Sequence, residues 1–500
     1  MDNYTLGLKL SAAGQHARAI EAFERALADN PSDTRTLFAL GNTARALGLT
    51  PAAEEFYRRV LALEPGRLEA IVNLANLLRA SGQFQAAEAV LCPALARDQK
   101  NPELLLVLGS VRREMSRPDE AIALYRQVLD EDSNSIAAQV NLADLLADRG
   151  EDTEALILYA RALKSDPGNA QARLNRAVLH LLRGNLSDGW RDYAARLKVP
   201  GKVPVPDHGL KRWSGEALKR TRLLITAEQG VGDHLMFASL IPELAARAEQ
   251  EGGSLILECE PRLKALFARS FPSVITRDWE IEKQHGAVLA HYGWLKKLGG
   301  ANAAIEMGSL PKLMRKTIAS FPAPHAYLKA DDEEAARWKA VFAGLPRPLV
   351  GFCWRSGLGG GERALQYAPK EAWAAFLREM PGTAVCTQYD AKPEEISALE
   401  RASGRSLVVP QGIDQKQELD RAAALFSALD AMVSAPTAVS WLSAGLGLPT
   451  FKALYGVSWT SFAQSYEPFA PSAQFLSPKT PGDWADVFVQ AQAKIRSLPG

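Results

Sequence analysis

The chain has few cysteines, almost no net charge and no long hydrophobic run. Its 500 residues include only four cysteines, without Cys-x-x-Cys spacing, so we expect neither a disulfide framework nor a zinc site of that type. Lys plus Arg number 58 and Asp plus Glu number 57, which argues against broad binding to nucleic acid or anionic membrane. No apolar stretch reaches the roughly 18 residues of a membrane helix, and the N-terminus lacks a signal-peptide layout. We therefore expect a cytoplasmic protein with reduced thiols and about three domains.

A 34-residue period marks the first 200 residues. Small residues recur in one phase at Gly7, Gly41, Ala75, Gly109, Ala143 and Ala177. A second small series is Ala19, Ala53, Ala87, Ala121, Ala155 and Gly189. A third, mostly aromatic series is Phe23, Tyr57, Leu91, Tyr125, Tyr159 and Tyr193. Small residues let two helices approach closely and an aromatic ring fills the gap to the next pair, so the pattern predicts stacked helical hairpins. It resembles the tetratricopeptide repeat (TPR) over residues 1–200.

Such an array forms a concave groove in which polar side chains can bind an extended peptide. Asn73, Asn141 and Asn175 share one repeat position, which is occupied by Val107 in the repeat between the first two. An inward-facing Asn can bond a peptide backbone through both its amide and its carbonyl, so these residues are candidates for binding a protein acceptor. The alternative is that each Asn caps or bridges neighbouring helices.

The pattern changes after Val199. Residues 201–218 form a Pro-containing linker, and short apolar runs then alternate with helical stretches, which is typical of parallel α/β domains. We expect a first half at 219–330 and a second half at 331–500, with a cleft where their strands end. A final amphipathic helix at 482–495 could cross back onto the first half.

The segment Glu-Gln-Gly-Val-Gly-Asp ends the first expected strand and begins a helix. Gly230 and Gly232 would let the backbone turn tightly beside a ligand, and the helix N-terminus favours an anion. Asp233 would then lie at the mouth of the cleft, where a carboxylate can take a proton from an attacking hydroxyl. The alternative is that Asp233 only caps its helix.

Three segments of the second half are candidates for binding an anionic donor. Arg355 and Ser356 follow a strand and precede a glycine-rich stretch and Arg363, which suits phosphate or carboxylate; the alternative is a mobile surface loop. Ser434 and Thr437 join a strand to a helix and can bind phosphate at its positive end, or act as plain caps.

The third segment contains Gln388 and Tyr389, where the Tyr389 ring would stack on a base or pack in the core. His234 and His291 have no partner at metal spacing, so surface or hydrogen-bonded core histidines are expected.

Five segments occur in a familiar order: EQGVGDHLMFASLIPEL, SLPKLMR, GFCWRSG, TQYD and SALDAMVSAPTAVSWLSAGLGLPT. Together with the repeats, they resemble bacterial TPR-containing glycosyltransferases of the GT-B fold, with two Rossmann-like halves. The nearest pattern is that of flagellin glycosyltransferases, which transfer nonulosonic acids to flagellin Ser or Thr inside the cell. The resemblance implies Asp233 as the base and Arg355, Ser356, Ser434 and Thr437 as donor-phosphate residues.

The chain departs from the wider family at one donor segment. Pro436 and Trp441 replace the Asp and His of an Asp-Thr-Ala-x-x-His run. The change suits a CMP-linked donor, such as CMP-pseudaminic or CMP-legionaminic acid, better than a nucleoside-diphosphate sugar. We therefore expect a metal-independent protein O-glycosyltransferase that needs no cofactor besides its nucleotide-sugar donor and binds an acceptor, flagellin in the closest pattern, through the TPR groove. The alternative is a non-catalytic TPR adaptor with a degenerate transferase domain.

Overall fold

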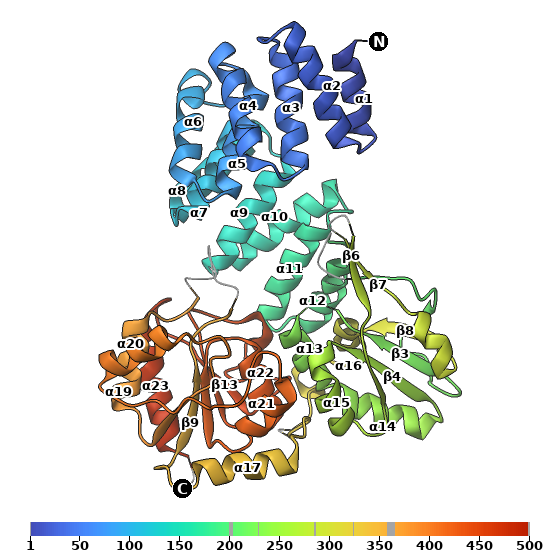
Figure 1. Cartoon of the computed structure of the whole chain (residues 1–500), viewed down its shortest axis with the longest axis vertical. Helices are drawn as coiled ribbons and strands as arrows, with labels where there is room; N and C mark the ends of the chain where they lie inside the picture. The colour runs from blue at the N-terminus through green and yellow to red at the C-terminus, as the bar shows by residue number, and fades with distance from the viewer. Residues whose placement is uncertain are drawn as a thin grey trace. The chain divides into compact units, whose positions relative to one another are not determined.

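The computed structural model describes residues 2–199, 204–228, 230–284, 287–323, 325–357 and 366–498. It consists of two compact units, Met1–Ala172 and Arg173–Gly500, which we call the N-terminal and C-terminal units. The N-terminal unit is all helical, and the C-terminal unit contains parallel sheets with helices on their faces (Figure 1). The predicted fold class, a helical solenoid followed by an α/β region, is confirmed.

The N-terminal unit is a row of helical hairpins. Its helices are α1 (Asn3–Ala12), α2 (His16–Asp29), α3 (Thr34–Ala46), α4 (Thr50–Leu63), α5 (Leu68–Ala80), α6 (Phe84–Arg97), α7 (Pro102–Glu114), α8 (Pro118–Glu131), α9 (Ile136–Asp148) and α10 (Asp152–Ser165). The unit boundary falls inside α11 (Ala170–Leu182).

The repeat series set the close packing inside each hairpin. A Cβ on Gly41 would lie 2.6 Å from the Tyr57 ring, so this position on α3 requires glycine for the ring on α4 to fit. The buried Tyr57 hydroxyl donates to Asn42 Oδ1 over 2.7 Å, which satisfies its hydrogen bond. The glycines between the two helices of a hairpin adopt a left-handed backbone, as at Gly48 (φ +75°), and Ser116 (φ +60°) does the same in the fourth repeat, which has no glycine there.

The first half of the C-terminal unit is a parallel sheet in the order β2-β8-β3-β4-β5. Its strands are β2 (Lys211–Arg212), β3 (Arg222–Thr226), β4 (Ser254–Cys259), β5 (Ile275–Asp278) and β8 (Ala303–Glu306). Its helices are α13 (Val231–Ala238), α14 (Ile241–Glu251), α15 (Lys264–Ser270) and α16 (Leu310–Met314), with 3₁₀ helices η2 (Pro261–Leu263), η3 (Gly293–Leu298), η4 (Met307–Ser309) and η5 (Ile318–Ser320). A separate small sheet has the strand order β1-β7-β6, with β1 at Val205–Pro206, β7 at Ala287–Ala290 and β6 at Ile281–Gln284.

The second half is a parallel sheet in the order β10-β9-β11-β12-β13. Its strands are β9 (Leu349–Cys353), β10 (Thr383–Cys386), β11 (Ala431–Ser434), β12 (Thr450–Ala453) and β13 (Ala473–Leu476). Its helices are α17 (Asp332–Phe342), α19 (Lys370–Glu379), α20 (Pro393–Ser403), α21 (Leu419–Phe426), α22 (Ala438–Gly445) and α23 (Trp484–Arg496), with 3₁₀ helix η6 (Trp459–Ser461). Figure 1 shows α19, α20 and α23 on one face of this sheet and α21 and α22 on the other.

Alternate residues along β9 point to opposite faces of the sheet and pack into different hydrophobic cores. Val350 and Phe352 of β9 pack with α19 and α23, whereas Leu349 and Cys353 face α21 and α22. The latter core continues into the first half through buried residues of β3, β4, α13 and α15, so the two halves share it. Cys259, Cys353 and Cys386 are buried free thiols in the strands of the two sheets.

One detail differs from the sequence-based expectations. The helix expected at 482–495 is α23, which packs on the second half's own sheet through residues such as Val487 and Phe488 and does not cross to the first half. The helix expected to begin at the Gly-Val-Gly-Asp segment is α13, which ends at Ala238, and α14 begins at Ile241 with Pro242 in its first turn.

The last helical hairpin belongs to the C-terminal unit. α12 (Leu186–Tyr193) and 3₁₀ helix η1 (Ala194–Lys198) follow α11, and the rings of Trp190 and Tyr193 enter the core shared by the two halves. The boundary between the two compact units lies at Ala172–Arg173, whereas the repeat array is expected to extend in the sequence to residue 200.

Candidate functional site

A cavity of about 370 Å³ lies in the C-terminal unit, between the two halves. Its lining residues come from both, namely Val231, Gly232, Arg262, Ser356, Gly357, Thr387, Tyr389, Gln415, Lys416, Leu419, Ala422, Phe426, Thr437, Ala438, Val439 and Leu442. Gly232, Ser356, Tyr389 and Thr437 were predicted from the sequence as site residues, and the structure brings these four together around this cavity. Gly230 lies next to it as the N-cap of α13.

Two helix N-termini, one from each half, reach this cavity. Val231 and Gly232 are the first residues of α13, and Thr437 is the N-cap of α22. A Cβ on Gly232 would lie 3.9 Å from the Ala438 Cα atom, which shows how closely the two helix starts approach. The backbone N–H groups of a first helical turn have no intrahelical partner and carry partial positive charge, so both ends favour an anion.

The charged side chains among the described lining residues are all basic. Arg262 and Lys416 contribute, and no Asp or Glu of the described chain belongs to the lining. Arg262 Nε donates to Glu260 Oε1 over 2.6 Å, and its Nη1 donates across to the carbonyl oxygen of Lys416 over 2.8 Å. The cavity therefore combines cationic side chains with two helix ends, a setting suited to phosphate.

Another part of the cavity wall is apolar and carries an aromatic ring. Leu419, Phe426 and Leu442 line it, and the half-buried Tyr389 stands beside them. The Tyr389 hydroxyl accepts a hydrogen bond from the Gly357 amide over 2.5 Å, which ties the strand-end loops of β9 and β10 together. A flat ring such as a nucleobase could contact this wall while a phosphate meets the helix ends.

Asp233 is half-buried and acts as a helix cap in this structure. Its Oδ2 atom accepts a hydrogen bond from the Gly230 amide over 3.2 Å, as the third helical residue of a capping box does. The residue before it, Gly232, lines the cavity. The structure thus accounts for the capping role, and the catalytic role of Asp233 stays a prediction.

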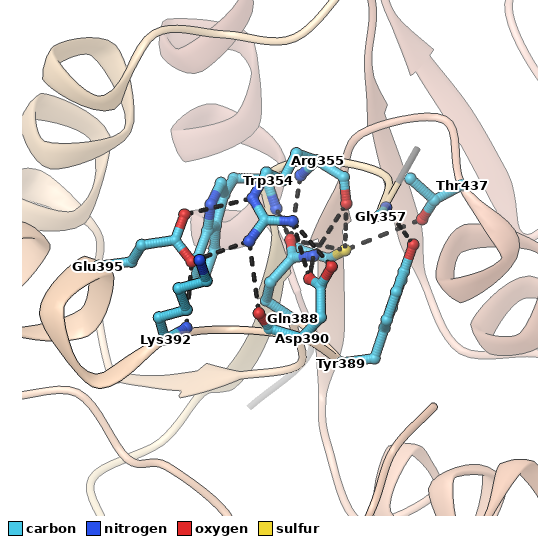
Figure 2. A network of polar contacts seen from close by, with 10 residues as sticks. Trp354, Arg355, Gly357, Gln388, Tyr389, Asp390, Lys392, Glu395 and Thr437 are labelled. Carbon is cyan, nitrogen blue, oxygen red and sulfur yellow. Dashed lines mark hydrogen bonds and ion pairs between the residues drawn. The ribbon is translucent and has the colours of Figure 1, made fainter. Parts of the chain in front are cut away.

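Arg355 is held by two carboxylates (Figure 2). Its Nη1 atom donates to both oxygens of Asp390 over 2.9 Å, and Nη2 donates to Glu395 Oε2 over 2.8 Å. These ion pairs raise the pKa of Arg355 and lower that of Glu395, against the opposing effect of burial. Arg355 is not among the cavity-lining residues, so its contacts make it a link between the end of β9 and the start of α20.

Gln388 and Ser434 are buried and bonded to the chain itself. Gln388 Oε1 accepts the amides of Trp354 and Arg355 over 3.0 Å each, and its Nε2 donates to Asp390 Oδ1 over 2.7 Å. Ser434 Oγ donates to the Ala435 carbonyl over 2.7 Å. Both residues position the loops around the cavity and do not line it. Arg363, the remaining donor candidate, lies outside the described residues.

The three candidate asparagines of the repeats are half-buried on the first helices of their hairpins. Asn73 Nδ2 donates to Asn42 Oδ1 over 2.9 Å, and Asn42 belongs to the preceding hairpin. This contact is the inter-helix bridge of the structural alternative. Asn141 and Asn175 occupy the equivalent places on α9 and α11.

Sequence reasoning missed Arg262, Lys416, Thr387 and Gln415. None of them belongs to a glycine-rich or helix-capping motif, and only Thr387 lies inside a marked segment, as the first residue of TQYD. Thr387 directly precedes the predicted Gln388, so the strand-end position was the available signal.

Two buried titratable groups lie at the same edge of the first sheet. His234 is 1% exposed, and burial lowers its pKa to about 4. Its Nδ1 atom accepts the Glu260 amide over 3.2 Å, so the ring is neutral at pH 7. Burial raises the pKa of Glu258 to about 7, although its Oε2 accepts from the Ala227 amide and the Tyr292 hydroxyl.

The helical part matches models of the tetratricopeptide repeat. One model matches residues 4–67, 106–170 and 140–200, and a second matches 44–110. The N-terminal part is therefore a TPR array, an architecture that binds protein partners.

Part of the chain is similar in sequence to a bacterial protein. Protein FlbA of Caulobacter vibrioides is 31% identical over 316 residues, which are 63% of this chain and 53% of that protein. The chain thus spans about half the length of the relative it matches.

Solved structures are similar to about a third of the chain. The thermophilic TPR protein TTC0263 of Thermus thermophilus is 29% identical, with a TM-score of 0.31, over 36% of this chain and 97% of that one. MamA is 26% identical, with a TM-score of 0.31, over 34% of this chain and 98% of that one. Among the described residues, no helix has both the length and the apolar character needed to span a membrane.

Proposed function

We propose that the C-terminal unit binds a nucleotide sugar in the cavity between its halves and transfers the sugar to Ser or Thr of a protein bound by the TPR array. The observation that carries this proposal is the composition of the cavity. Two helix N-termini, Arg262 and Lys416 surround one space, with an aromatic and apolar wall and no carboxylate among the described lining residues. A phosphate joined to a flat ring fits this combination.

Phosphate release in such a site depends on fixed dipoles and basic side chains. As the sugar–phosphate bond breaks, negative charge grows on the phosphate, and the ends of α13 and α22 would stabilise it. Asp233 would accept the proton of the attacking hydroxyl, one residue from the cavity wall. The order of the sequence motifs supports this assignment of roles.

The finer form of the proposal names donor and acceptor. The donor is a CMP-linked nonulosonic acid, and the acceptor is flagellin held in the TPR groove. The support for it is the resemblance of the motifs, together with Pro436 and Trp441 in place of an Asp and a His. A donor with one phosphate needs fewer polar partners than a nucleoside diphosphate.

A second candidate is a nucleotide-binding adaptor without transfer activity. One observation favours it: Arg355, a residue implied by the resemblance to bind the donor, is neutralised by Asp390 and Glu395. Hydrolysis or transfer of the donor by the purified chain separates the two functions, since an adaptor would bind nucleotide but release no sugar.

Calorimetric titration of the chain with CMP, UMP and ADP tests the proposed site. Lys416→Met should weaken nucleotide binding about two- to fivefold, because an exposed charge pair contributes up to about 1 kcal/mol, and the loss should shrink at high salt. Lys296→Met is the matched control, an exposed lysine outside the cavity lining. No binding of any nucleotide by the wild-type chain would refute the proposal.

A further inference from the structure

The last helical hairpin is built into the C-terminal unit and contacts both of its halves. Trp190 on α12 is 2% exposed, and its Nε1 atom donates to the Arg315 carbonyl in the first half over 2.9 Å. Its ring meets those of Phe462 and Phe469 in the second half edge-on, at centroid distances of 5.6 and 6.2 Å. The hairpin is therefore part of the unit that holds the cavity.

Directly after α12, Arg196 of η1 forms a buried ion pair with Glu228. The two residues are 2% and 1% exposed. Arg196 Nε donates to Glu228 Oε2 over 2.9 Å and Nη2 donates to Oε1 over 2.6 Å, so the guanidinium binds both carboxylate oxygens. Nη2 also donates to Ser309 Oγ over 2.9 Å. The Arg196 guanidinium further lies 4.7 Å from the Tyr193 ring centroid.

A third segment closes around this pair. The Gly308 amide donates to Glu228 Oε1 over 2.6 Å. A Cβ on residue 308 would lie 2.7 Å from the same oxygen and 3.0 Å from Arg196 Nη2, so a side chain there would disrupt the pair. The Glu228 carboxylate is thus bonded by two distant parts of the chain, Arg196 of η1 and Gly308 of η4.

Glu228 connects the end of β3 to the cavity. β3 ends at Thr226, Gly230 is the N-cap of α13, and Gly232 lines the cavity. The Ala227 amide is itself fixed by Glu258 Oε2 over 2.9 Å. Ala227 and Glu228, which follow β3, are therefore anchored through two buried carboxylates, and that of Glu228 is paired with Arg196.

We propose that Arg196, supplied by the repeat hairpin, is a positioning residue for the cavity: through Glu228 it sets the backbone from which the N-terminus of α13 faces the ligand. A two-point guanidinium–carboxylate contact fixes orientation, whereas a buried ion pair is weak evidence for stability alone. The consequence for nucleotide binding rests on the function proposed above. The consequence for the order of α13 does not.

The test uses the full chain and two readouts. Arg196→Met breaks the pair, and the double variant Arg196→Met/Glu228→Leu replaces it with apolar side chains, a change that often preserves stability. Arg176→Met is the matched control, since Arg176 pairs with Asp192 within the same hairpin over 2.7 Å. The readouts are hydrogen exchange of peptides covering residues 231–238, measured without ligand, and the affinity for CMP.

In Arg196→Met we expect exchange in α13 to rise and CMP binding to weaken, each about tenfold, as for the loss of one hydrogen bond to a charged group. The double variant should regain thermal stability while both readouts stay changed, and Arg176→Met should change neither. Recovery of both readouts in the double variant, or no change in Arg196→Met, would overturn the inference. If the wild type binds no nucleotide, the proposed function fails, and the exchange result alone decides the positioning role.

Discussion

At Asp233, the carboxylate that accepts the Gly230 amide belongs to the residue next to the cavity lining. Asparagine keeps an oxygen that can accept the same amide, but it cannot take up a proton at neutral pH. A substitution to asparagine therefore separates the capping role from the role of a base.

We predict that Asp233→Asn lowers sugar transfer roughly 100- to 10,000-fold, the usual contribution of a general base. The melting temperature and the nucleotide affinity should stay near those of the wild type, because the cap is preserved. Transfer assays with a donor and an acceptor protein, run beside thermal unfolding, check this. Transfer above a third of the wild-type rate would leave Asp233 as a cap only.

His234 and Glu258 give the folded state two opposite responses to pH. The pKa of His234 is lowered to about 4, so its contribution to stability is lost as the pH falls from about 6.5 to about 4. The pKa of Glu258 is raised to about 7, so the folded state keeps a proton that the unfolded state releases near pH 4.5. Stability is therefore lost as the pH rises from about 4.5 to about 7. Each loss amounts to about 3 kcal/mol over its full pH range, and because the two slopes have opposite signs, the net pH dependence from this pair is small near pH 5 to 6.

Single substitutions should expose each response. Glu258→Gln removes the second effect and keeps an acceptor for the Ala227 amide, so its melting temperature should fall on acidification below pH 6.5 more steeply than that of the wild type. His234→Asn keeps an acceptor for the Glu260 amide, and its melting temperature should fall as the pH rises from 4.5 to 7. Melting curves at half-unit pH steps decide this, and parallel profiles for all three proteins would contradict it.

Among the elements, those marked by local patterns were predictable. The small and aromatic series predicted the hairpins because each contact, such as Gly41 with Tyr57, lies inside one repeat and returns in the next. The strand–glycine–helix pattern predicted that Gly232 would reach a ligand cavity. Side-chain pairs between distant segments produce no local or repeating sequence pattern from which they could be predicted. The partners of Arg355 lie 35 and 40 residues away, and Glu228 lies 32 residues from Arg196.

The Arg355 link gives a prediction about two loops. Arg355→Ala would leave Asp390 and Glu395 without their shared cation, and we expect a loss of about 1–3 kcal/mol in the free energy of unfolding. Nucleotide binding should weaken indirectly, since Gly357 and Tyr389 lie in the loops that this link joins. Denaturant unfolding and calorimetry on the same variant check both parts. Weaker binding with unchanged stability would instead indicate direct contact between Arg355 and the donor.

For the molecule as a whole, the division of the fold decides where the chain can be cut. Residues 168–500 keep Trp190 and Arg196, and we expect them to unfold in one cooperative transition and to bind nucleotide. Residues 205–500 lack both, which leaves the buried Glu228 charge unpaired at about 3–5 kcal/mol and removes a buried tryptophan at about 3–5 kcal/mol. This shorter chain should aggregate or melt at a much lower temperature. Circular dichroism melts of the two chains compare them directly, and equal stability would contradict the role given to the hairpin.

In several hairpins an aromatic ring packs directly on a glycine of the same hairpin. This arrangement affects which mutations of the gene the fold can tolerate. Phe23 meets Gly7, Tyr57 meets Gly41 and Tyr125 meets Gly109, so each of these hairpins carries both parts of its own contact. An unequal crossover that duplicates or deletes one whole period would keep every such contact intact. A point mutation at one of these glycines would place a methyl group against a ring. Lineages of this protein should therefore differ more readily in the number of repeats than in the identity of these small residues.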